Sequence, residues 1–331
     1  MSSSNTRLLV LYTGGTIGMQ QGPSGLLPAS GFEERLRTRQ ALETEALPDW
    51  HFRELSPPLD SADMTQANWL EMAAAVRRGV EGGGCDAVVV LHGTDTLAYS
   101  AAALSFLLLG LGVPVVLTGA MLPAGAEGSD AWPNLFGAMR AVQRGVPTGV
   151  HLYFNGALLH GARVTKLRSD AFDAFDCLPR RRNAAPAVPL PVALDHRAVR
   201  RPVPLAVLPL HPGVRAETLD ALVDSGIRGL LLECYGSGTG PSGDVRLLDA
   251  LRRAHARGVV LAAISQCPAG HIDFEVYATG SALRDAGLVS GGGMTREAAL
   301  GKLFALLGAG LSQAEVEHWF VRDLCGEMAG P

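Results

Sequence analysis

Two short motifs place hydroxyl and charged side chains directly after apolar runs in this 331-residue chain. Thr13-Gly14-Gly15-Thr16-Ile17-Gly18 follows the run 8–12, and His92-Gly93-Thr94-Asp95-Thr96 follows the run 88–91. Short apolar runs bounded by glycine are typical of buried parallel strands, and ligands of open α/β sheets bind at the carboxyl ends of such strands. We therefore expect the two motifs to converge on one substrate.

The hydroxyls in these motifs could act as nucleophiles in acyl transfer. Threonine is a weak nucleophile at neutral pH, so it needs a partner that takes its proton. Thr94, Asp95 and Lys166 can form such a relay, because desolvation and a neighbouring acid tune the proton affinity of a lysine. A surface ion pair is the alternative for Lys166. The other lysine, Lys302, lies in an amphipathic pattern, for which we expect a solvated position.

Each motif has a simpler interpretation. The glycines could serve tight turns and the threonines could cap helices. His92 ends a buried run, so we expect it to be packed and hydrogen-bonded rather than a general base. The other histidines lack metal-ligand spacing, and the chain has neither a dinucleotide-binding glycine pattern nor a P-loop. We therefore predict no metal and no cofactor.

The elements that must position these residues alternate between strand and helix, which predicts a parallel α/β sheet. A composition shift after three consecutive arginines suggests an interdomain linker. We expect a domain at 1–183, a linker at 184–204 and a second domain at 205–331. Predicted strands are 8–12, 88–91, 114–117, 149–154, 205–208, 229–232 and 259–264. Predicted helices are 66–80, 97–109, 135–144, 216–225, 245–256 and two C-terminal segments.

The two motifs and their order resemble the bacterial-type L-asparaginase family, and residues 12–20 resemble its cytoplasmic type I branch. The resemblance runs from Leu8 to about Glu327 and implies a larger N-terminal, flavodoxin- or Rossmann-like parallel-sheet domain and a smaller C-terminal α/β domain. It also implies an intimate homodimer, often paired into a tetramer. It assigns Thr16 as the nucleophile on a mobile N-terminal loop, supported by Thr94, Asp95 and Lys166.

Substrate-binding residues also follow from the resemblance. The segment Asp60-Ser61 matches the family's binding segment, in which a carboxylate and a hydroxyl hold the ammonium and carboxylate of an amino acid. Asp95 is expected to reach the ammonium as well. The segment 118–123 resembles the turn whose backbone carbonyl, that of Ala120 here, accepts the substrate amide. A helix cap is the simpler role for Asp60-Ser61, and both roles are compatible.

Three positions depart from the family pattern. Leu26 stands where the loop over the nucleophile usually carries a tyrosine, and leucine excludes water but relays no proton. Thr239 stands where an asparagine is common. Glu233 stands where type I enzymes with an effector site use an arginine, so we expect repulsion of an effector carboxylate.

Composition limits the partners. A hydrophobic fraction of 47% and a net charge of −4 are ordinary for a globular protein and give no basic field for nucleic acid. The N-terminus has no signal-peptide core, no run approaches the roughly 20 residues of a membrane span, and five cysteines without paired spacing predict no disulfide framework. We therefore expect a cytoplasmic protein with a small-molecule partner and no membrane.

The expected activity is hydrolysis of L-asparagine to L-aspartate and ammonia through an acyl-threonine. Two alternatives remain open: a broader amidohydrolase acting on L-glutamine or D-asparagine, favoured by the missing tyrosine, and a catalytically weakened amino-acid-binding protein. Intact Thr16, Thr94 and Lys166 favour the enzyme.

Overall fold

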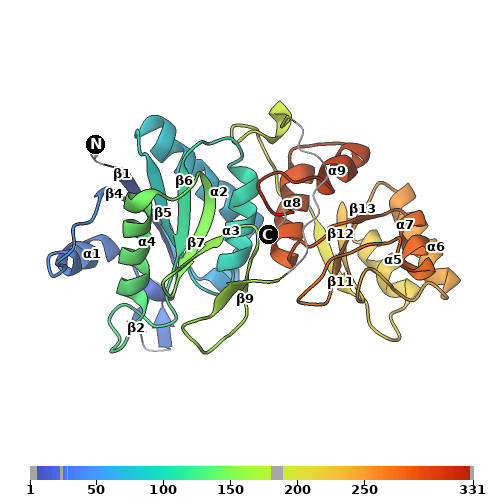
Figure 1. Cartoon of the computed structure of the whole chain (residues 1–331), viewed down its shortest axis with the longest axis horizontal. Helices are drawn as coiled ribbons and strands as arrows, with labels where there is room; N and C mark the ends of the chain where they lie inside the picture. Colours follow the sequence, from blue (N-terminus) through green and yellow to red (C-terminus); the bar gives the residue numbers. More distant parts are fainter. Residues whose placement is uncertain (1–5, 23–24, 28, 180–188, 329–331) are drawn as a thin grey trace. The chain divides into compact units, whose positions relative to one another are not determined.

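The computed structural model describes residues 6–22, 25–27, 29–179 and 189–328 (Figure 1). Its contacts divide the chain into two compact units, residues 1–177 and 178–331. Each unit is built around a parallel sheet with helices, which confirms the expected α/β class and its larger N-terminal part. The contact division falls between Cys177 and Leu178, and the bounds 1–183, 184–204 and 205–331 stay predictions.

The first unit holds a six-stranded sheet of order β4-β1-β5-β6-β7-β8, in which only β8 runs antiparallel to its neighbour. Its strands are β1 (Arg7–Gly14), β4 (Asp49–Leu59), β5 (Ala87–Leu91), β6 (Pro114–Thr118), β7 (Gly149–Phe154) and β8 (Ala157–His160). Two hairpins lie outside this sheet: β2 (Gln20–Gly22) with β3 (Gly25–Leu27), and β9 (Val164–Lys166) with β10 (Phe175–Cys177).

Helices cover both faces of this sheet, which explains why its central strands are apolar throughout (Figure 1). Helices α1 (Phe32–Gln40) and α4 (Ala131–Gly145) pack on the face that carries Val10 and Tyr12. Helices α2 (Gln66–Arg77) and α3 (Leu97–Leu107) lie on the other face. Short helical turns occur at η1 (Thr16–Gly18), η2 (Ser61–Asp63) and η3 (Arg78–Gly82).

Helix α4 begins four residues earlier than the pattern predicts, at Ala131 instead of Leu135. Pro133 lies within the additional turn. Proline is tolerated in the first turn of a helix, because its missing N–H has no intrahelical partner there. The additional turn brings Asp130 and Asn134 to the carboxyl edge of the sheet.

The second unit contains a parallel sheet of order β11-β12-β13-β14. Helices α5, α6 and α7 share one core with this sheet, and α8 and α9 contact its other face (Figure 1). The strands are β11 (Leu205–Pro209), β12 (Gly229–Cys234), β13 (Val260–Ser265) and β14 (Leu288–Ser290). The helices are α5 (Ala216–Asp224), α6 (Val245–Ala256), α7 (Ala278–Asp285), α8 (Arg296–Gly308) and α9 (Gln313–Phe320), with a short turn η4 (Val192–Leu194) before the sheet.

Lys302 is buried, so the predicted solvated position was wrong. Its Nζ donates to a Glu327 carboxylate oxygen at 2.5 Å and to the Arg322 carbonyl, and both charged side chains are 0% exposed. Burial alone would raise the pKa of Glu327, but the charge of Lys302 and hydrogen bonds with Asp323, Lys302 and the Cys325 backbone outweigh it and lower the pKa to about 2. The error arose because α8 is enclosed on nearly all sides, so its polar position faces a buried acid instead of water.

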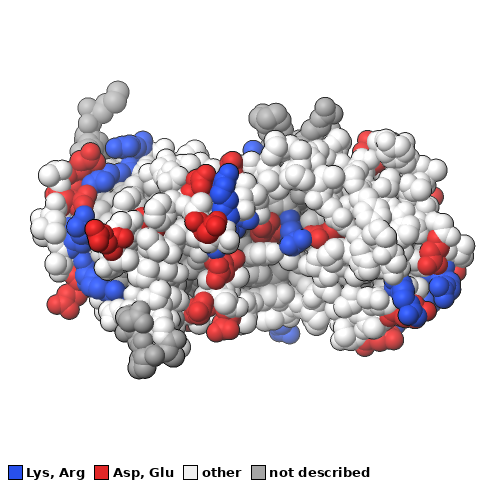
Figure 2. All heavy atoms as spheres, turned by 90° about the horizontal axis from the view of Figure 1, so that it is seen from below, with Lys and Arg blue, Asp and Glu red and all other residues white. Residues whose placement is uncertain are grey.

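Figure 2 shows how charges are distributed on one face of the molecule. On the face shown in Figure 2, acidic and basic side chains are interspersed among the described residues, and no continuous basic area is visible there. Among the helices of the described residues, none has both the length and the apolar content required to span a bilayer. Within the same residues no group of three or more His, Cys, Asp or Glu side chains is arranged to hold a metal ion.

Candidate active site

The loops after β1, β4 and β5 meet through backbone contact. A Cβ built on Gly15 would lie 2.2 Å from the Gly93 nitrogen, so only glycine allows this approach. The Gly15 N–H donates to the Leu59 carbonyl at 3.1 Å, which ties the end of β4 to the same place. Because Thr16 and Thr94 directly follow the two touching glycines, the two predicted hydroxyl motifs do converge at the carboxyl edge of the sheet.

Thr16 begins the short helix η1 and is half-buried. The residues after it are fixed on both sides of the turn. Ile17 is fully buried and its carbonyl accepts the Ala124 N–H at 3.2 Å. The Gly18 carbonyl accepts Nη2 of Arg35 at 3.0 Å. The backbone that carries Thr16 is therefore held by contacts from α1 and from the loop before α4.

Lys166 joins the two other predicted relay residues. Its Nζ donates to the Thr94 hydroxyl at 3.0 Å and to the Asp95 carboxylate at 2.9 Å. Thr94 is buried, the Lys166 side chain is 19% exposed and the Asp95 side chain is 64% exposed. The lysine comes from β9, which packs against α3, whereas Thr94 and Asp95 precede α3. The arrangement can pass a proton from a buried hydroxyl to the lysine nitrogen in its neutral amine form, and the acidic partner of this nitrogen reaches solvent.

Asp60 and Ser61 lie at the start of η2, beside the same glycine. A Cβ on Gly93 would lie 2.4 Å from the Ser61 hydroxyl, and the Thr96 hydroxyl donates to the Ser61 carbonyl at 2.8 Å. Ser61 is buried and Asp60 is half-buried. Asp60 also caps η2, because one of its carboxylate oxygens accepts the Ala62 N–H at 3.0 Å. The cap occupies one oxygen, so the cap and the predicted ligand role are compatible.

The predicted amide-binding turn reaches the same edge from β6. A Cβ on Gly119 would lie 2.3 Å from the His92 carbonyl and 3.8 Å from the Thr94 methyl group. Ala120 follows and is fully buried. Asp130 and Asn134 hydrogen-bond to this turn, yet no sequence motif singles them out. The sequence feature that could have identified them is an Asp and an Asn four residues apart at a helix start, after a glycine-rich loop.

His92 has a structural role, as expected. The indole N–H of Trp69 donates to the Ser100 hydroxyl at 2.9 Å, and this hydroxyl lies 2.9 Å from Nε2 of His92. Nδ1 lies 2.7 Å from the Gly93 carbonyl, so the neutral ring with its proton on Nδ1 satisfies every partner. Burial lowers the pKa of His92 to about 4. The histidine is therefore neutral at pH 7 and both its nitrogens are occupied.

Comparisons with known proteins identify the family of this chain. A sequence model of "Asparaginase, N-terminal" matches residues 7–186, and one of "Glutaminase/Asparaginase C-terminal domain" matches residues 205–320. L-asparaginase 1 of Escherichia coli (strain K12) is 36% identical over 333 residues, and the match covers 97% of each protein. This chain belongs to the asparaginase family.

Two further relatives extend the comparison. The solved structure of L-asparaginase I from Vibrio cholerae superposes with a TM-score of 0.86 at 35% identity and covers 98% of this chain and 100% of that one. The 60 kDa lysophospholipase of Homo sapiens is 36% identical, and the match covers 98% of this chain but 62% of that protein.

Leu26 departs from the resemblance to the asparaginase family. It lies on β3, pairs with Gln21 across the β2–β3 hairpin and is 44% exposed. Tyr12 cannot supply the missing phenol, because it is fully buried and its hydroxyl donates to the Ala29 carbonyl at 3.0 Å. Burial raises the pKa of Tyr12 to about 12, so this phenol keeps its proton. The lid role of Leu26 stays a prediction.

Glu233 is buried in the second unit and its charge is paired. Arg296 donates to its two carboxylate oxygens at 2.5 and 2.8 Å. The predicted repulsion of an effector carboxylate is therefore offset by a neighbouring guanidinium, and Glu233 acts as part of an ion pair in this structure. Thr239 makes an isolated bridge with Tyr235.

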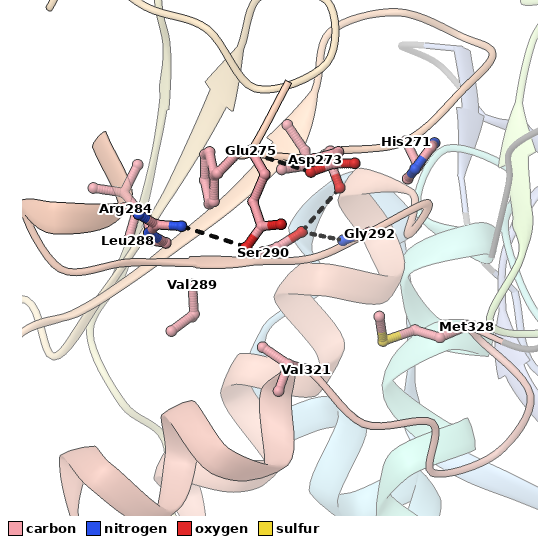
Figure 3. Close-up of a pocket in the computed structure, with 12 residues that line it drawn as sticks. His271, Asp273, Glu275, Arg284, Leu288, Val289, Ser290, Gly292, Val321 and Met328 are labelled. Atoms are coloured by element: carbon pink, nitrogen blue, oxygen red, sulfur yellow. Dashed lines mark hydrogen bonds and ion pairs between the residues drawn. The ribbon is translucent and has the colours of Figure 1, made fainter. Parts of the chain in front are cut away.

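The second unit also has a cavity of about 530 Å³ (Figure 3). Apolar side chains including Val289, Val321 and Met328 line one side. On the opposite rim Arg284 pairs with Glu275 at 3.5 Å. None of the predicted site residues lines this cavity.

Proposed function

We propose that this protein hydrolyses L-asparagine to L-aspartate and ammonia. The observation that carries the proposal is the placement of Lys166 between the Thr94 hydroxyl and the Asp95 carboxylate, next to the glycine contact that Thr16 follows. Membership of the asparaginase family supports an amidohydrolase with this site.

In the proposed reaction the Thr16 hydroxyl attacks the side-chain carboxamide carbon of the substrate. Its proton passes through the Thr94 and Lys166 pair to the leaving nitrogen, so that ammonia departs and an aspartyl ester remains on Thr16. Water then attacks the ester carbon and the released proton restores the Thr16 hydroxyl. Two easier steps replace one difficult amide hydrolysis, and no cofactor is required.

The substrate is held by groups of matching charge and hydrogen-bonding type. We assign the substrate ammonium to Asp60 and Asp95, and its carboxylate to the Ser61 hydroxyl and nearby backbone N–H groups. The Ala120 carbonyl accepts the carboxamide N–H. Asp95 thus has two partners, the substrate ammonium and Lys166, and its 64% exposure leaves carboxylate surface available for the first.

Leu26 favours the alternative of broader substrate use. A lid without a phenol does not assist proton removal from Thr16 in acylation, so turnover depends more on Thr94, Asp95 and Lys166. A weakened amino-acid-binding protein would keep the anchors but release no ammonia. Ammonia release by the purified protein from L-asparagine, D-asparagine and L-glutamine separates these possibilities, with Thr16→Ala as the blank. Preferred release from L-asparagine supports the proposal. Binding of L-asparagine without ammonia release refutes it.

We also propose a homo-oligomer, either a dimer or a dimer of dimers, located in the cytoplasm. Both follow from the resemblance to the type I branch. Light scattering on the purified chain at several concentrations tests the assembly, and a monomer at every concentration would refute it.

A further inference from the structure

The start of α4 carries two polar side chains that lie against the Gly119–Leu122 turn. Asp130 and Asn134 are only 9% and 2% exposed. Burying an acid and an amide is costly unless hydrogen bonds satisfy them. The backbone of this turn, the Asn155 N–H and the contact between the two side chains satisfy them, so they tie the turn to the start of α4.

Asp130 occupies the position before α4 but does not cap that helix with its side chain. Instead both carboxylate oxygens accept the Met121 N–H at 3.0 Å, and one of them also accepts the Leu122 N–H at 3.1 Å. The Ser129 hydroxyl takes over the capping, because it accepts the Ala131 N–H at 3.1 Å. The strong acceptor at this helix start is thus directed at the turn instead of the helix.

Asn134 binds the other side of the turn. Its Nδ2 donates to the Gly119 carbonyl and to the Asp130 carboxylate, both at 3.0 Å, and its Oδ1 accepts the Asn155 N–H at 2.9 Å. These partners fix the orientation of the amide, since two acceptors face the NH₂ group and one donor faces the oxygen. The Gly119 carbonyl is therefore held inward, toward α4.

Within the described part of the chain, the next carbonyl, that of Ala120, has no hydrogen-bond partner. Its neighbours are tied on both sides: the Gly119 carbonyl to Asn134, and the Met121 N–H to Asp130. Gly119 also rests against the His92 carbonyl and near the Thr94 methyl group. The two side chains thereby leave one buried carbonyl without a partner among the described residues, beside the Thr94 relay.

We propose that Asp130 and Asn134 are positioning residues that direct the Ala120 carbonyl at the carboxamide N–H of the substrate and so favour amides over esters. The inference rests on the proposed function and adds a source of specificity to it. Neither side chain reaches the substrate. They act by fixing the peptide that does, and a small displacement of such a peptide is enough to weaken catalysis.

The test compares two substrates that differ only in the group recognised. L-Asparagine carries the N–H donors, whereas the β-methyl ester of L-aspartate offers the same acyl group without them. In Asn134→Ala we expect kcat/KM for L-asparagine to fall about thirtyfold and that for the ester to fall less than about threefold, because a misplaced acceptor affects only the donor substrate. Asp130→Asn, which preserves shape, should show the same difference if Asn134→Ala does not fold.

Ser129→Ala is the matched control, because it removes two hydrogen bonds at the same helix start, one from the Ala131 N–H and one to the Leu122 carbonyl at the end of the turn, and leaves the contacts of the Gly119 carbonyl and the Met121 N–H in place. We expect it to change kcat/KM for both substrates by less than about twofold, because a lost helix cap affects stability alone. Equal losses for the amide and the ester in Asn134→Ala and Asp130→Asn would overturn the inference. A parent enzyme that releases no ammonia from L-asparagine would refute the proposed function and this inference together.

Discussion

Replacing Lys166 by methionine should separate a working relay from a surface ion pair. The substitution preserves much of the side-chain length and removes two charge-assisted hydrogen bonds, one to Thr94 at 3.0 Å and one to Asp95 at 2.9 Å. A hydrogen bond to a charged group contributes about 1.5–3 kcal/mol when its partner is not hydrated instead. If the contact to Thr94 operates in the transition state, loss of this hydrogen bond alone lowers turnover about 13- to 160-fold. Loss of the proton transfer that it carries should bring the decrease to at least about a hundredfold.

The effect on stability should be small by comparison. The Asp95 side chain is 64% exposed, so water replaces Lys166 as its partner and the pair contributes at most about 1 kcal/mol. That corresponds to a decrease in Tm of about 4 °C or less. Lys166→Arg keeps the charge, but a guanidinium stays protonated and is bulkier, so we expect it to fail as well. A surface ion pair predicts the opposite result, with arginine restoring activity.

The assay is ammonia release from L-asparagine under saturating and limiting substrate, with Tm measured on the same preparations. Arg168→Met is the matched control, since Arg168 forms an ion pair with Asp173 at 3.1 Å, two residues along the chain from Lys166. It should leave turnover within about twofold, the range of exposed ion pairs. If Lys166→Arg retains activity within a fewfold of the parent, Lys166 is an electrostatic or structural partner and the relay is refuted.

Four other substitutions give measurable outcomes. Thr16→Ala and Thr94→Val should each lower ammonia release at least about a hundredfold without changing the circular dichroism spectrum, and near-parental release would exclude that residue's role. Leu26→Tyr should raise the pre-steady-state acylation rate about tenfold by restoring a hydrogen bond worth roughly 1.4 kcal/mol, whereas an unchanged or slower rate in a folded variant would exclude the compensated-lid explanation. Lys302→Met should destabilise the protein by about 3–5 kcal/mol in urea unfolding, because it leaves Glu327 buried without a counterion. The pKa of Glu327 lies near 2 in the folded protein and 4.5 unfolded, so its contribution is complete above pH 4.5 and is lost as the pH falls toward 2. A parent whose stability does not change across that interval would contradict this pairing.

The fold could be predicted wherever apolar residues marked an element. Strands β1, β5 and β6 were predicted nearly in full because they are buried on both faces. Strand β4 was missed, since Pro57 and Pro58 lie within it and argue against a strand. Its place at the sheet edge explains the exception, because an edge strand needs only one hydrogen-bonded neighbour. Helix α1 was missed because only Phe32 and Leu36 in it are buried, too few to give a periodic signal.

The two lysines show that the sequence alone does not determine the environment of a charged side chain. Lys166 and Lys302 both gain a carboxylate partner, but one partner is largely exposed and the other is fully buried. A pattern of apolar residues identifies a helix face only when one side of the helix meets water, and α8 is enclosed on nearly all sides. The pattern around Lys302 therefore carried no information about its environment.

A reactive side chain can be identified from its motif, whereas its position is set by residues that the motif does not contain. The glycines at 15 and 93 belong to the motifs, because two loops can touch only where neither carries a Cβ. Asp130 and Asn134 belong to none, since any buried acceptor and donor at a helix start look alike in sequence. Both side chains hydrogen-bond to the backbone of a turn. The three-dimensional structure alone determines which backbone group of that turn they leave for a ligand. Specificity for the amide, in this protein, is thus a property of the helix behind the site as much as of the residues that line it.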